Sequence, residues 1–209
     1  MLTGGEGSTT WFTSDLHLGH PLVSGIRGFG EDEAGVARHD ETLLGNLREA
    51  LREGDHLWIL GDISSGWEPQ EEAALDKIQS ALRGDDMPRV YLHLVSGNHD
   101  STHPLHTYAY LRQPRFLEVF DSVQSMQNLL WEGHTVWLNH FPRPGQDHIP
   151  GGSRHDELRL DVPWMLHGHL HSPRPITGIG QVDVGVDPWG LKPVVKEELM
   201  ETLMASGRA

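Results

Sequence analysis

The chain has 209 residues, 37% hydrophobic and 22% charged, which predicts one globular domain spanning residues 1–209. It contains no cysteine, so disulfides, thiolate zinc sites and cysteine nucleophiles are excluded. The formal net charge of −14 argues against a broad electrostatic grip on nucleic-acid backbones.

Nothing in the sequence indicates a membrane partner. No apolar run approaches the ~20 residues that a membrane helix needs. The first ten residues are rich in Gly and Thr and lack the apolar core of a signal peptide. We therefore expect a cytoplasmic protein, and the sequence carries no prediction of its oligomeric state.

The first hundred residues alternate between predicted strands and helices. Short apolar runs predict strands at 11–14, 56–60 and 89–95. Apolar residues at helical spacing predict a helix over 32–52, and Pro69 opens a second predicted helix over 69–82. This βαβαβ alternation predicts an α/β layer architecture.

The second half of the chain is predicted to be mostly strands. Apolar runs predict them at 116–120, 123–131, 135–138, 163–166 and 181–186, with a turn at Glu132-Gly133. A closing helix is predicted over 196–204. Two sheets with outer helices are therefore expected. The Pro/Gly/Arg/His-rich segment 141–159 is predicted to be a loop, and loops of that length are often functional.

Five polar clusters each follow a predicted strand. Residues two apart in extended chain face the same side, so Asp15 and His17 can meet one ion, as can His169 and His171. Open α/β sheets place ligand sites at the carboxyl ends of their strands. Without thiolates, these nitrogen and oxygen ligands favour Mn, Fe, Co, Ni or Zn. The clusters are Asp15-Leu16-His17, Gly61-Asp62, Gly97-Asn98-His99-Asp100, Asn139-His140 and Gly168-His169-Leu170-His171.

The clusters differ in how specific they are. Gly61-Asp62 alone is a common turn, and His140 alone reads as an ordinary packed histidine. The third cluster is more specific, because Asn98 offers a neutral oxygen, His99 a titratable imidazole, and Asp100 a carboxylate able to orient that imidazole. Jointly the five clusters predict a centre that holds two metal ions side by side.

Substrate anions also need positive or hydrogen-bonding groups outside the metals. By position, the candidates are Arg27, Arg143, Arg154 and Lys192. Most histidines outside the clusters are interpreted as surface or packing residues, with His20 and His148 as possible exceptions. Each of these residues is alternatively an ordinary surface side chain.

The clusters resemble the motifs of the calcineurin-like metallophosphoesterase superfamily. Those motifs run D-x-H, G-D, G-N-H-[DE], a histidine after a small or polar residue, and G-H-x-H, and the chain carries all five in order. The fourth departs mildly, since Asn139 precedes His140 where Gly or Ser is commoner. The stretch 15–20 and the tail 184–193 are similar to small bacterial and phage phosphoesterases, whose physiological substrate is poorly defined.

The resemblance implies a four-layer α/β/β/α sandwich with two metals at one sheet edge. It also implies the ligands. One ion would be held by Asp15, His17, Asp62 and His171, and the other by Asp62, Asn98, His140 and His169. Asp62 would bridge both ions together with a water or hydroxide, and His99 is not expected to be a ligand.

The predicted function is that of a dinuclear phosphoesterase. A metal-bridging hydroxide would attack a phosphodiester or phosphomonoester, with the diester and Mn²⁺ favoured over the monoester and over Fe, Zn, Ni or Co. His99, oriented by Asp100, would protonate the leaving alkoxide or donate to a phosphoryl oxygen. Two alternatives stay open. A metal-dependent nuclease is disfavoured by the acidic charge, and a non-catalytic binding module is disfavoured by the complete ligand set.

Overall fold

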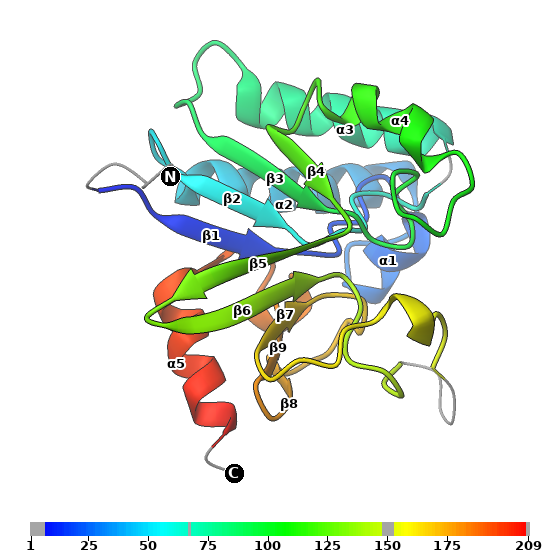
Figure 1. Cartoon of the computed structure of the whole chain (residues 1–209). Coiled ribbons are helices and arrows are strands. Elements are labelled where there is room, and N and C mark those ends of the chain that lie inside the picture. The colour runs from blue at the N-terminus through cyan, green and yellow to red at the C-terminus, as the bar shows by residue number, and fades with distance from the viewer. Residues whose placement is uncertain (1–6, 67, 148–152, 208–209) are drawn as a thin grey trace.

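Two β-sheets pack face to face in the computed structural model, which describes residues 7–66, 68–147 and 153–207. Helices cover the outer face of the first sheet, and a further helix lies beside the second (Figure 1). The α/β class and the layered sandwich predicted from the sequence are therefore confirmed.

The first sheet has the strand order β10-β1-β2-β3-β4. Its first four strands along the chain pair in parallel, and β10 pairs antiparallel with β1. Parallel strands end at the same edge, so the loops after β1, β2 and β3 meet there. The strands are β1 Thr10–Thr13, β2 His56–Ile59, β3 Tyr91–Val95, β4 Ser122–Gln124 and β10 Val194–Val195.

The second sheet has the order β5-β6-β7-β9-β8. The antiparallel pair β5–β6 is joined by the predicted turn at Glu132-Gly133, whose residues adopt φ of 49° and 85°. β6, β7 and β9 then run parallel, which brings the loops after β6 and β7 to one edge. The strands are β5 Met126–Trp131, β6 His134–Asn139, β7 Met165–His167, β8 Ile176–Gly178 and β9 Gln181–Asp183.

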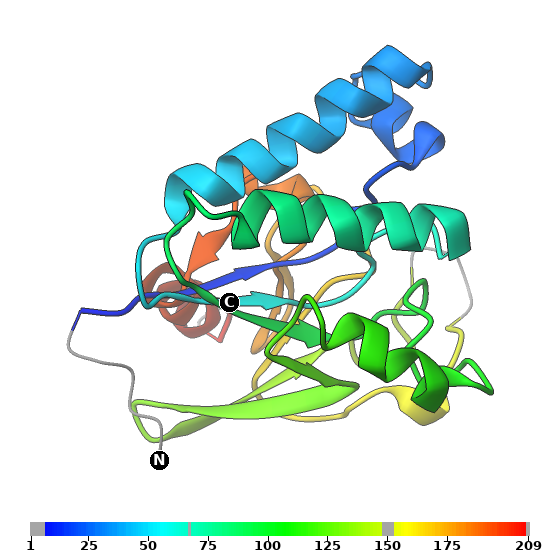
Figure 2. The ribbon, with the colours of Figure 1, turned by 90° about the horizontal axis from the view of Figure 1, so that it is seen from above.

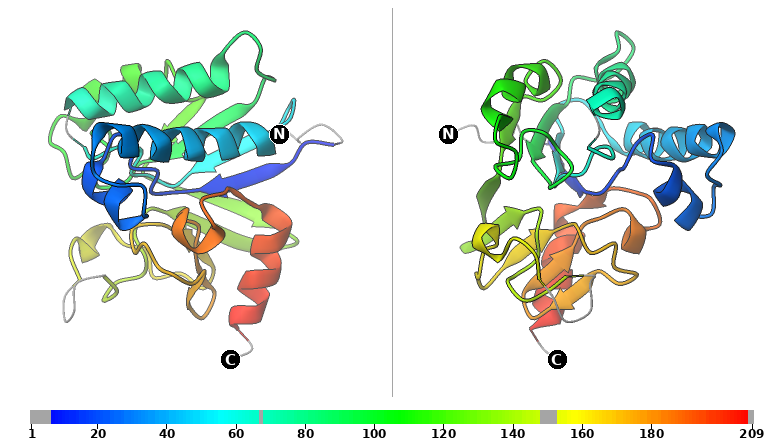
Figure 3. Two further views of the ribbon diagram at one scale, coloured as in Figure 1. Left: turned by 180° about the vertical axis from the view of Figure 1, so that it is seen from behind. Right: turned by 90° about the vertical axis from the view of Figure 1, so that its right-hand side faces the viewer.

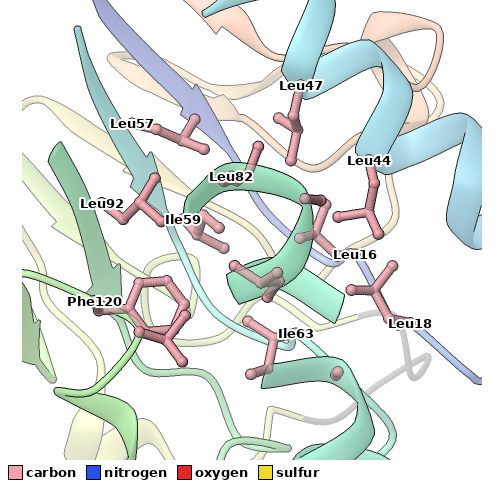
Figure 4. Close-up of a cluster of buried hydrophobic side chains, with 14 of the residues drawn as sticks. Leu16, Leu18, Leu44, Leu47, Leu57, Ile59, Ile63, Leu82, Leu92 and Phe120 are labelled. Carbon is pink, nitrogen blue, oxygen red and sulfur yellow. The ribbon is translucent and has the colours of Figure 1, made fainter. Parts of the chain in front are cut away.

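Helices α2 Glu33–Ala50 and α3 Glu68–Arg83 lie side by side over the outer face of the first sheet (Figure 2). The side chain of Asp32 caps α2 by accepting from the backbone N–H of Gly35 at 2.7 Å. The apolar faces of both helices pack on the sheet in the outer cluster shown in Figure 4. Its members include Leu44, Leu47, Leu57, Ile59, Leu82, Leu92 and Phe120.

A second apolar core fills the space between the two sheets. Phe12 of β1 and Leu60, which directly follows β2, pack in this core with Leu138 of β6 and Val182 of β9. Helix α5 Lys196–Ser206 closes the side of the sandwich formed by β8, β9 and β10 (Figure 3). Its Leu199, Met200 and Leu203 enter this core, so the fourth layer of the predicted sandwich is a single helix.

Two predicted elements differ from the structure. The predicted strand 116–120 is the end of α4 Ala109–Phe116 and the turn after it, because Phe116, Val119 and Phe120 are buried at helical rather than alternating spacing. The predicted strand 123–131 is two strands, since the chain bends at Ser125 and passes from the first sheet to the second.

Among the elements that had no prediction are β8, β10 and helix α1 Pro21–Ile26. Each has six residues or fewer, too short for a periodic pattern. The predicted loop 141–159 contains one 3-10 turn at Asp156–Leu158. Among the described residues, no helix is long and apolar enough to cross a membrane.

Candidate metal centre

All the predicted metal ligands follow strands at one edge of the sandwich. In the first sheet, Asp15 and His17 follow β1, Asp62 follows β2 and Asn98 follows β3. In the second sheet, His140 follows β6, and the pair His169 and His171 follows β7. The two sheets therefore supply opposite walls of one site.

Five of these residues have a left-handed backbone. The φ angles are 56° at Asp15, 46° at His17, 54° at Asp62, 70° at His169 and 47° at His171. A non-glycine residue held in a sparsely populated backbone region costs of order 1–3 kcal/mol, and such residues cluster at functional sites. The loops are tied together in this conformation, since the N–H of Asp15 donates to Gly61 O and that of His17 to Asp62 O, both at 3.0 Å.

Two glycines make room for the close approach of these loops. A Cβ on Gly97 would lie 2.3 Å from Asp62 Oδ1, and one on Gly168 would lie 2.4 Å from Asp15 Oδ2. A side chain at either position would collide with a predicted ligand. Neither Gly97 nor Gly168 has a positive φ. The first glycine of the Gly-Asn-His-Asp and Gly-His-x-His patterns is therefore explained by the lack of space for a side chain.

The first group consists of Asp15, His17 and His171. Each offers one candidate metal-ligand atom, a carboxylate oxygen or an imidazole nitrogen, and these atoms lie within 4.8 Å of one another. The Nε2 atoms of His17 and His171 are 3.1 Å apart, and each is under 4 Å from Asp15 Oδ1, at 3.9 and 3.8 Å. Asp62 Oδ2 lies 3.7 Å from His17 Nε2. The structure brings together all four residues predicted for one ion.

The second group surrounds Asn98. Its Oδ1 is 3.1 Å from His140 Nε2 and 3.0 Å from His169 Nδ1. His140 Nε2 is also 3.4 Å from Asp62 Oδ2, and donor atoms of Asp15, Asp62 and His140 form a further group within 4.8 Å. Asp62 therefore contacts both groups, as the resemblance implies for a bridging carboxylate.

The hydrogen bonds of the imidazoles test whether a cation fits. Nδ1–H of His17 donates to Ser64 O at 3.1 Å, and Nδ1–H of His171 donates to Asp187 at 3.0 Å. If both rings are neutral, each points an Nε2 lone pair at the other across 3.1 Å. Facing lone pairs repel unless a cation or proton lies between them. Burial would lower the pKa of His171, but the Asp187 hydrogen bond and the Asp15 charge outweigh it and raise that pKa, so this ring holds a proton more readily than that of His17. The donor set fits a divalent ion bound by nitrogen and oxygen.

Burial and charge set the protonation states of these side chains. Burial lowers the pKa of His17 well below its usual range and that of His169 to about 2, so both rings are neutral. Burial would raise the pKa of Asp62, but the His140 and His17 imidazoles outweigh it and hold that pKa well below its usual range. Asp62 in turn raises the pKa of His140 to about 10, despite its burial. A metal at this position displaces one proton.

His99 lies at the open side of the centre. Its side chain is 41% exposed, and its Nε2 is 4.0 Å from Asp62 Oδ2. Nδ1–H donates to Ser65 O at 2.9 Å, while the His99 backbone N–H donates to Asp62 Oδ1 at 2.8 Å. The ring is thus oriented by a backbone carbonyl and presents Nε2 toward the site.

The prediction that Asp100 orients the His99 imidazole differs from the structure. The Asp100 carboxylate accepts the backbone N–H groups of Asp62, Ile63 and Gly97 at 3.0, 3.0 and 2.7 Å. It is fully buried, and burial together with the Asp62 charge raises its pKa to about 7. Asp100 therefore holds the two loops that carry Asp62 and Asn98, rather than the His99 ring, because buried N–H groups need an acceptor.

The arginines predicted as substrate contacts have internal partners instead. The Arg27 guanidinium binds Asp187 and the carbonyls of Asp15 and Leu16, and its side chain is 4% exposed. Arg143 donates to the carbonyls of Val162, Pro163, Ile179 and Gly180. Both guanidinium groups thus donate to partners within the chain, Arg27 to buried groups and Arg143 to groups nearer the surface.

The remaining candidates lie in different surroundings. His20 is beside the centre, with its ring 5.6 Å from that of His17, and its Nδ1 is a buried atom without a hydrogen-bond partner among the described residues. Arg154 is half-exposed, with Nε 3.7 Å from Asp147 Oδ2. Lys192 lines a cleft with Trp11 and with Asn46 and Ala50 near the C-terminal end of α2. His148 is outside the described residues.

Two aspartates near the centre had no prediction as site residues. Asp187 accepts from His171 Nδ1, and Asp147 Oδ1 lies 3.3 Å from His169 Nε2. Asp187 belongs to the tail 184–193, which resembles the phosphoesterase subgroup, so a signal for it was present. Asp147 lies in the irregular loop after β6, where no pattern marks it.

Comparisons with known proteins agree with this architecture. Residues 8–173 match the model of the calcineurin-like phosphoesterase family. The gene 66 proteins of Mycobacterium phages L5 and D29 are 37% and 34% identical over 195 and 190 residues. The matched regions are 88% of this chain and 88% of the L5 protein, and 87% of this chain and 89% of the D29 protein.

A crystal structure of a protein of unknown function from Aquifex aeolicus, AQ665, superimposes with a TM-score of 0.65 at 21% identity. The match covers 94% of this chain and 100% of that chain. At this identity, the likeness concerns the fold alone.

Proposed function

The chain belongs to the calcineurin-like phosphoesterase family, and on that premise we propose that it hydrolyses phosphodiesters with the help of two divalent cations. The observation that carries the proposal is the convergence of two aspartates, an asparagine and four histidines at one edge of the sandwich. His17, His171 and Asp15 face one another on one side of Asp62, and His140 faces Asn98 on the other. Buried charged groups are either paired with one another or coordinate metals, and this donor set is suited to coordination.

Each proposed ion would have two nitrogen and two oxygen ligands. Asp15, His17, Asp62 and His171 would hold the first, and Asp62, Asn98, His140 and His169 the second. Bound there, the ions would supply Lewis acidity and a lowered pKa for coordinated water. We propose Mn²⁺ as the occupant because the ligands are imidazole, carboxylate and amide oxygen with no thiolate.

His99 is proposed as the group that delivers a proton to the leaving oxygen. Its exposed Nε2 lies at the open side of the centre, and its Nδ1–H is fixed on Ser65 O. A protonated ring keeps that hydrogen bond and turns Nε2–H toward the substrate. Proton transfer of this kind contributes about 10²–10⁴-fold to a rate.

The preference for a diester is supported by the charge of the surroundings. The charge of the Arg27 guanidinium is compensated by its ion pair with Asp187, so it adds little net charge to the substrate side. The imidazoles of His20 and His99 lie beside the centre and carry no fixed positive charge. A diester carries one negative charge where a monoester carries two, so it needs less opposing charge.

The test compares a chromogenic phosphodiester with the matching phosphomonoester. The protein is stripped of metal and assayed with and without added Mn²⁺. We expect turnover only with the metal, and faster turnover of the diester. Faster monoester turnover would overturn the substrate preference, and two bound ions without turnover of either ester would overturn the proposal and favour a binding module.

His99→Ala tests the proton donor. The variant is expected to bind both ions and to lose about 10²-fold or more in kcat on an alkyl diester, whose leaving group needs a proton. A nitrophenyl diester should be affected less, because its leaving anion is stable. His134→Ala, which removes an exposed histidine of β6, is the matched control. Wild-type turnover of the alkyl diester by His99→Ala would contradict the assignment.

A further inference from the structure

The two histidines of the His169-x-His171 pair are each backed by an aspartate that is itself paired with an arginine. Asp187 and Arg27 stand behind His171, and Asp147 and Arg159 stand behind His169. We call these the first and second backing pairs. The four residues come from three separate segments of the chain, none of them adjacent in sequence to the histidines they serve.

The first backing pair is bidentate. Arg27 Nε donates to Asp187 Oδ1 and its Nη2 to Oδ2, both at 2.9 Å. Asp187 Oδ2 then accepts from His171 Nδ1 at 3.0 Å. Because Nδ1 carries the proton, His171 is restricted to presenting Nε2 to the centre.

The second backing pair is buried more deeply. Arg159 Nη2 donates to Asp147 Oδ2 at 3.0 Å, and neither side chain is exposed. Asp147 Oδ1 lies 3.3 Å from His169 Nε2, so a proton on Nε2 leaves Nδ1 to face Asn98. Arg159 also stacks over Phe141, with its guanidinium carbon 4.8 Å from the ring centre.

The two histidines therefore present opposite ring nitrogens, one Nε2 and one Nδ1, although they are two residues apart on one loop. We propose that the first and second backing pairs are positioning devices, each of which sets the affinity of one metal site independently of the other. This inference rests on the proposed two-metal function. Partners that orient a metal-ligating histidine typically contribute about 10–100-fold in metal affinity.

The independence follows from where the pairs are anchored. Arg27 follows α1, and it also donates to the carbonyls of Asp15 and Leu16, which belong to the loop of the first ion's ligands. Arg159 donates to the carbonyl of Gln146 at 2.5 Å, in the loop after β6 that follows His140. Each pair is thus joined to the loop of its own group of ligands.

The experiment is a Mn²⁺ titration of the metal-stripped protein by calorimetry, in wild type, Asp187→Asn and Asp147→Asn. We expect two ions in the wild type, and one site weakened about 10–100-fold in each variant. Asp121→Asn is the matched control. Its carboxylate pairs with Arg83 and accepts from Leu92 N at the opposite end of the first sheet, so both affinities should stay unchanged.

Combination with a ligand variant identifies which site is affected. In His171→Ala, the first site is already lost, so adding Asp187→Asn should change the remaining ion little, whereas adding Asp147→Asn should weaken it. Nitrogen NMR of the histidine rings gives a second readout. Asp147→Asn should broaden or shift the His169 signals and leave those of His171 in place.

Loss of a counter-charge beside a buried arginine can unfold a protein, so thermal melting accompanies each titration. For a variant that does not fold, Asp187→Glu or Asp147→Glu keeps the charge but displaces the carboxylate from the ring, and a weakened single site is again expected. Two ions bound with wild-type affinity in folded variants would overturn this inference alone. A wild-type protein that binds no ion would overturn the proposed function as well.

Discussion

The strand β2 has a buried aspartate at each end, and the two are surrounded in opposite ways. Asp55 precedes the strand, and its carboxylate accepts from Thr9 N, Trp11 Nε1 and Arg52 N at 2.8, 3.1 and 2.9 Å. Asp62 follows the strand in a left-handed conformation. Its carboxylate accepts from the His99 N–H and otherwise faces imidazole rings.

The difference separates a structural carboxylate from the proposed bridging ligand. Each aspartate is 2% exposed, so burial does not distinguish them. Asp55 meets donors that a folded chain supplies by itself, which is how a buried carboxylate is stabilised. Asp62 sits among groups that compete for the same proton or cation, and its neighbours keep a backbone conformation that costs free energy.

The largest effect on kcat is expected from neutralising Asp62, and neutralising Asp55 provides the comparison. Asp62→Asn should lower kcat by about 10³-fold, the upper end for removal of one group that stabilises a transition state. Asp55→Asn should leave the kcat of the folded protein unchanged and reduce its free energy of unfolding. Steady-state kinetics and urea unfolding separate the two. Equal losses of kcat would remove the distinction between the two ends of the strand.

A smaller effect is expected at the glycine that packs against Asp62. Gly97→Ala places a Cβ 2.3 Å from Asp62 Oδ1 and 2.8 Å from His140 Nδ1, so one of these side chains must move. A displacement near 1 Å can cost about 10²-fold in rate. Gly45→Ala in α2 is the control, because Gly45 has no positive φ and its Cβ would come no nearer than 3.8 Å to another side chain. If Gly97→Ala retains wild-type kcat, the tight packing of the loops is not needed for catalysis.

The smallest effect on turnover is expected in the outer cluster under α2. Leu47→Ala removes a buried side chain there and should cost about 2–5 kcal/mol of unfolding free energy. The kcat of the folded variant, measured well below its melting temperature, should match that of the wild type. A reduced kcat would show that packing under the helices reaches the carboxyl ends of the strands.

The sequence predicted the elements whose side chains repeat with a clear period. Helix α2 and the strands β2 and β3 were placed within a few residues, because their apolar positions recur regularly. The segment 116–120 was misassigned because its apolar residues are dense enough for either interpretation. The division at Ser125 left no signal, since both of its flanks favour strands.

The candidate ligands could be identified because short patterns placed them after strands. Their surroundings could not be, because they depend on residues distant in sequence. His99 is oriented by the carbonyl of Ser65, and a backbone carbonyl leaves no mark on a sequence. Arg27 and Arg143 had suitable charge and position, and only the fold reveals that internal partners occupy them.

The division of the site between the two sheets has a consequence for synthesis on the ribosome. His17 and its facing partner His171 are separated by 154 positions, so the emerging chain offers Asp15, His17 and Asp62 long before the group can be completed. A chain that stops before β7 has no histidine pair to oppose them. If the proposed ions bind, this geometry would be complete only after β7 has been made, so the finished sandwich rather than the nascent peptide would select the ion.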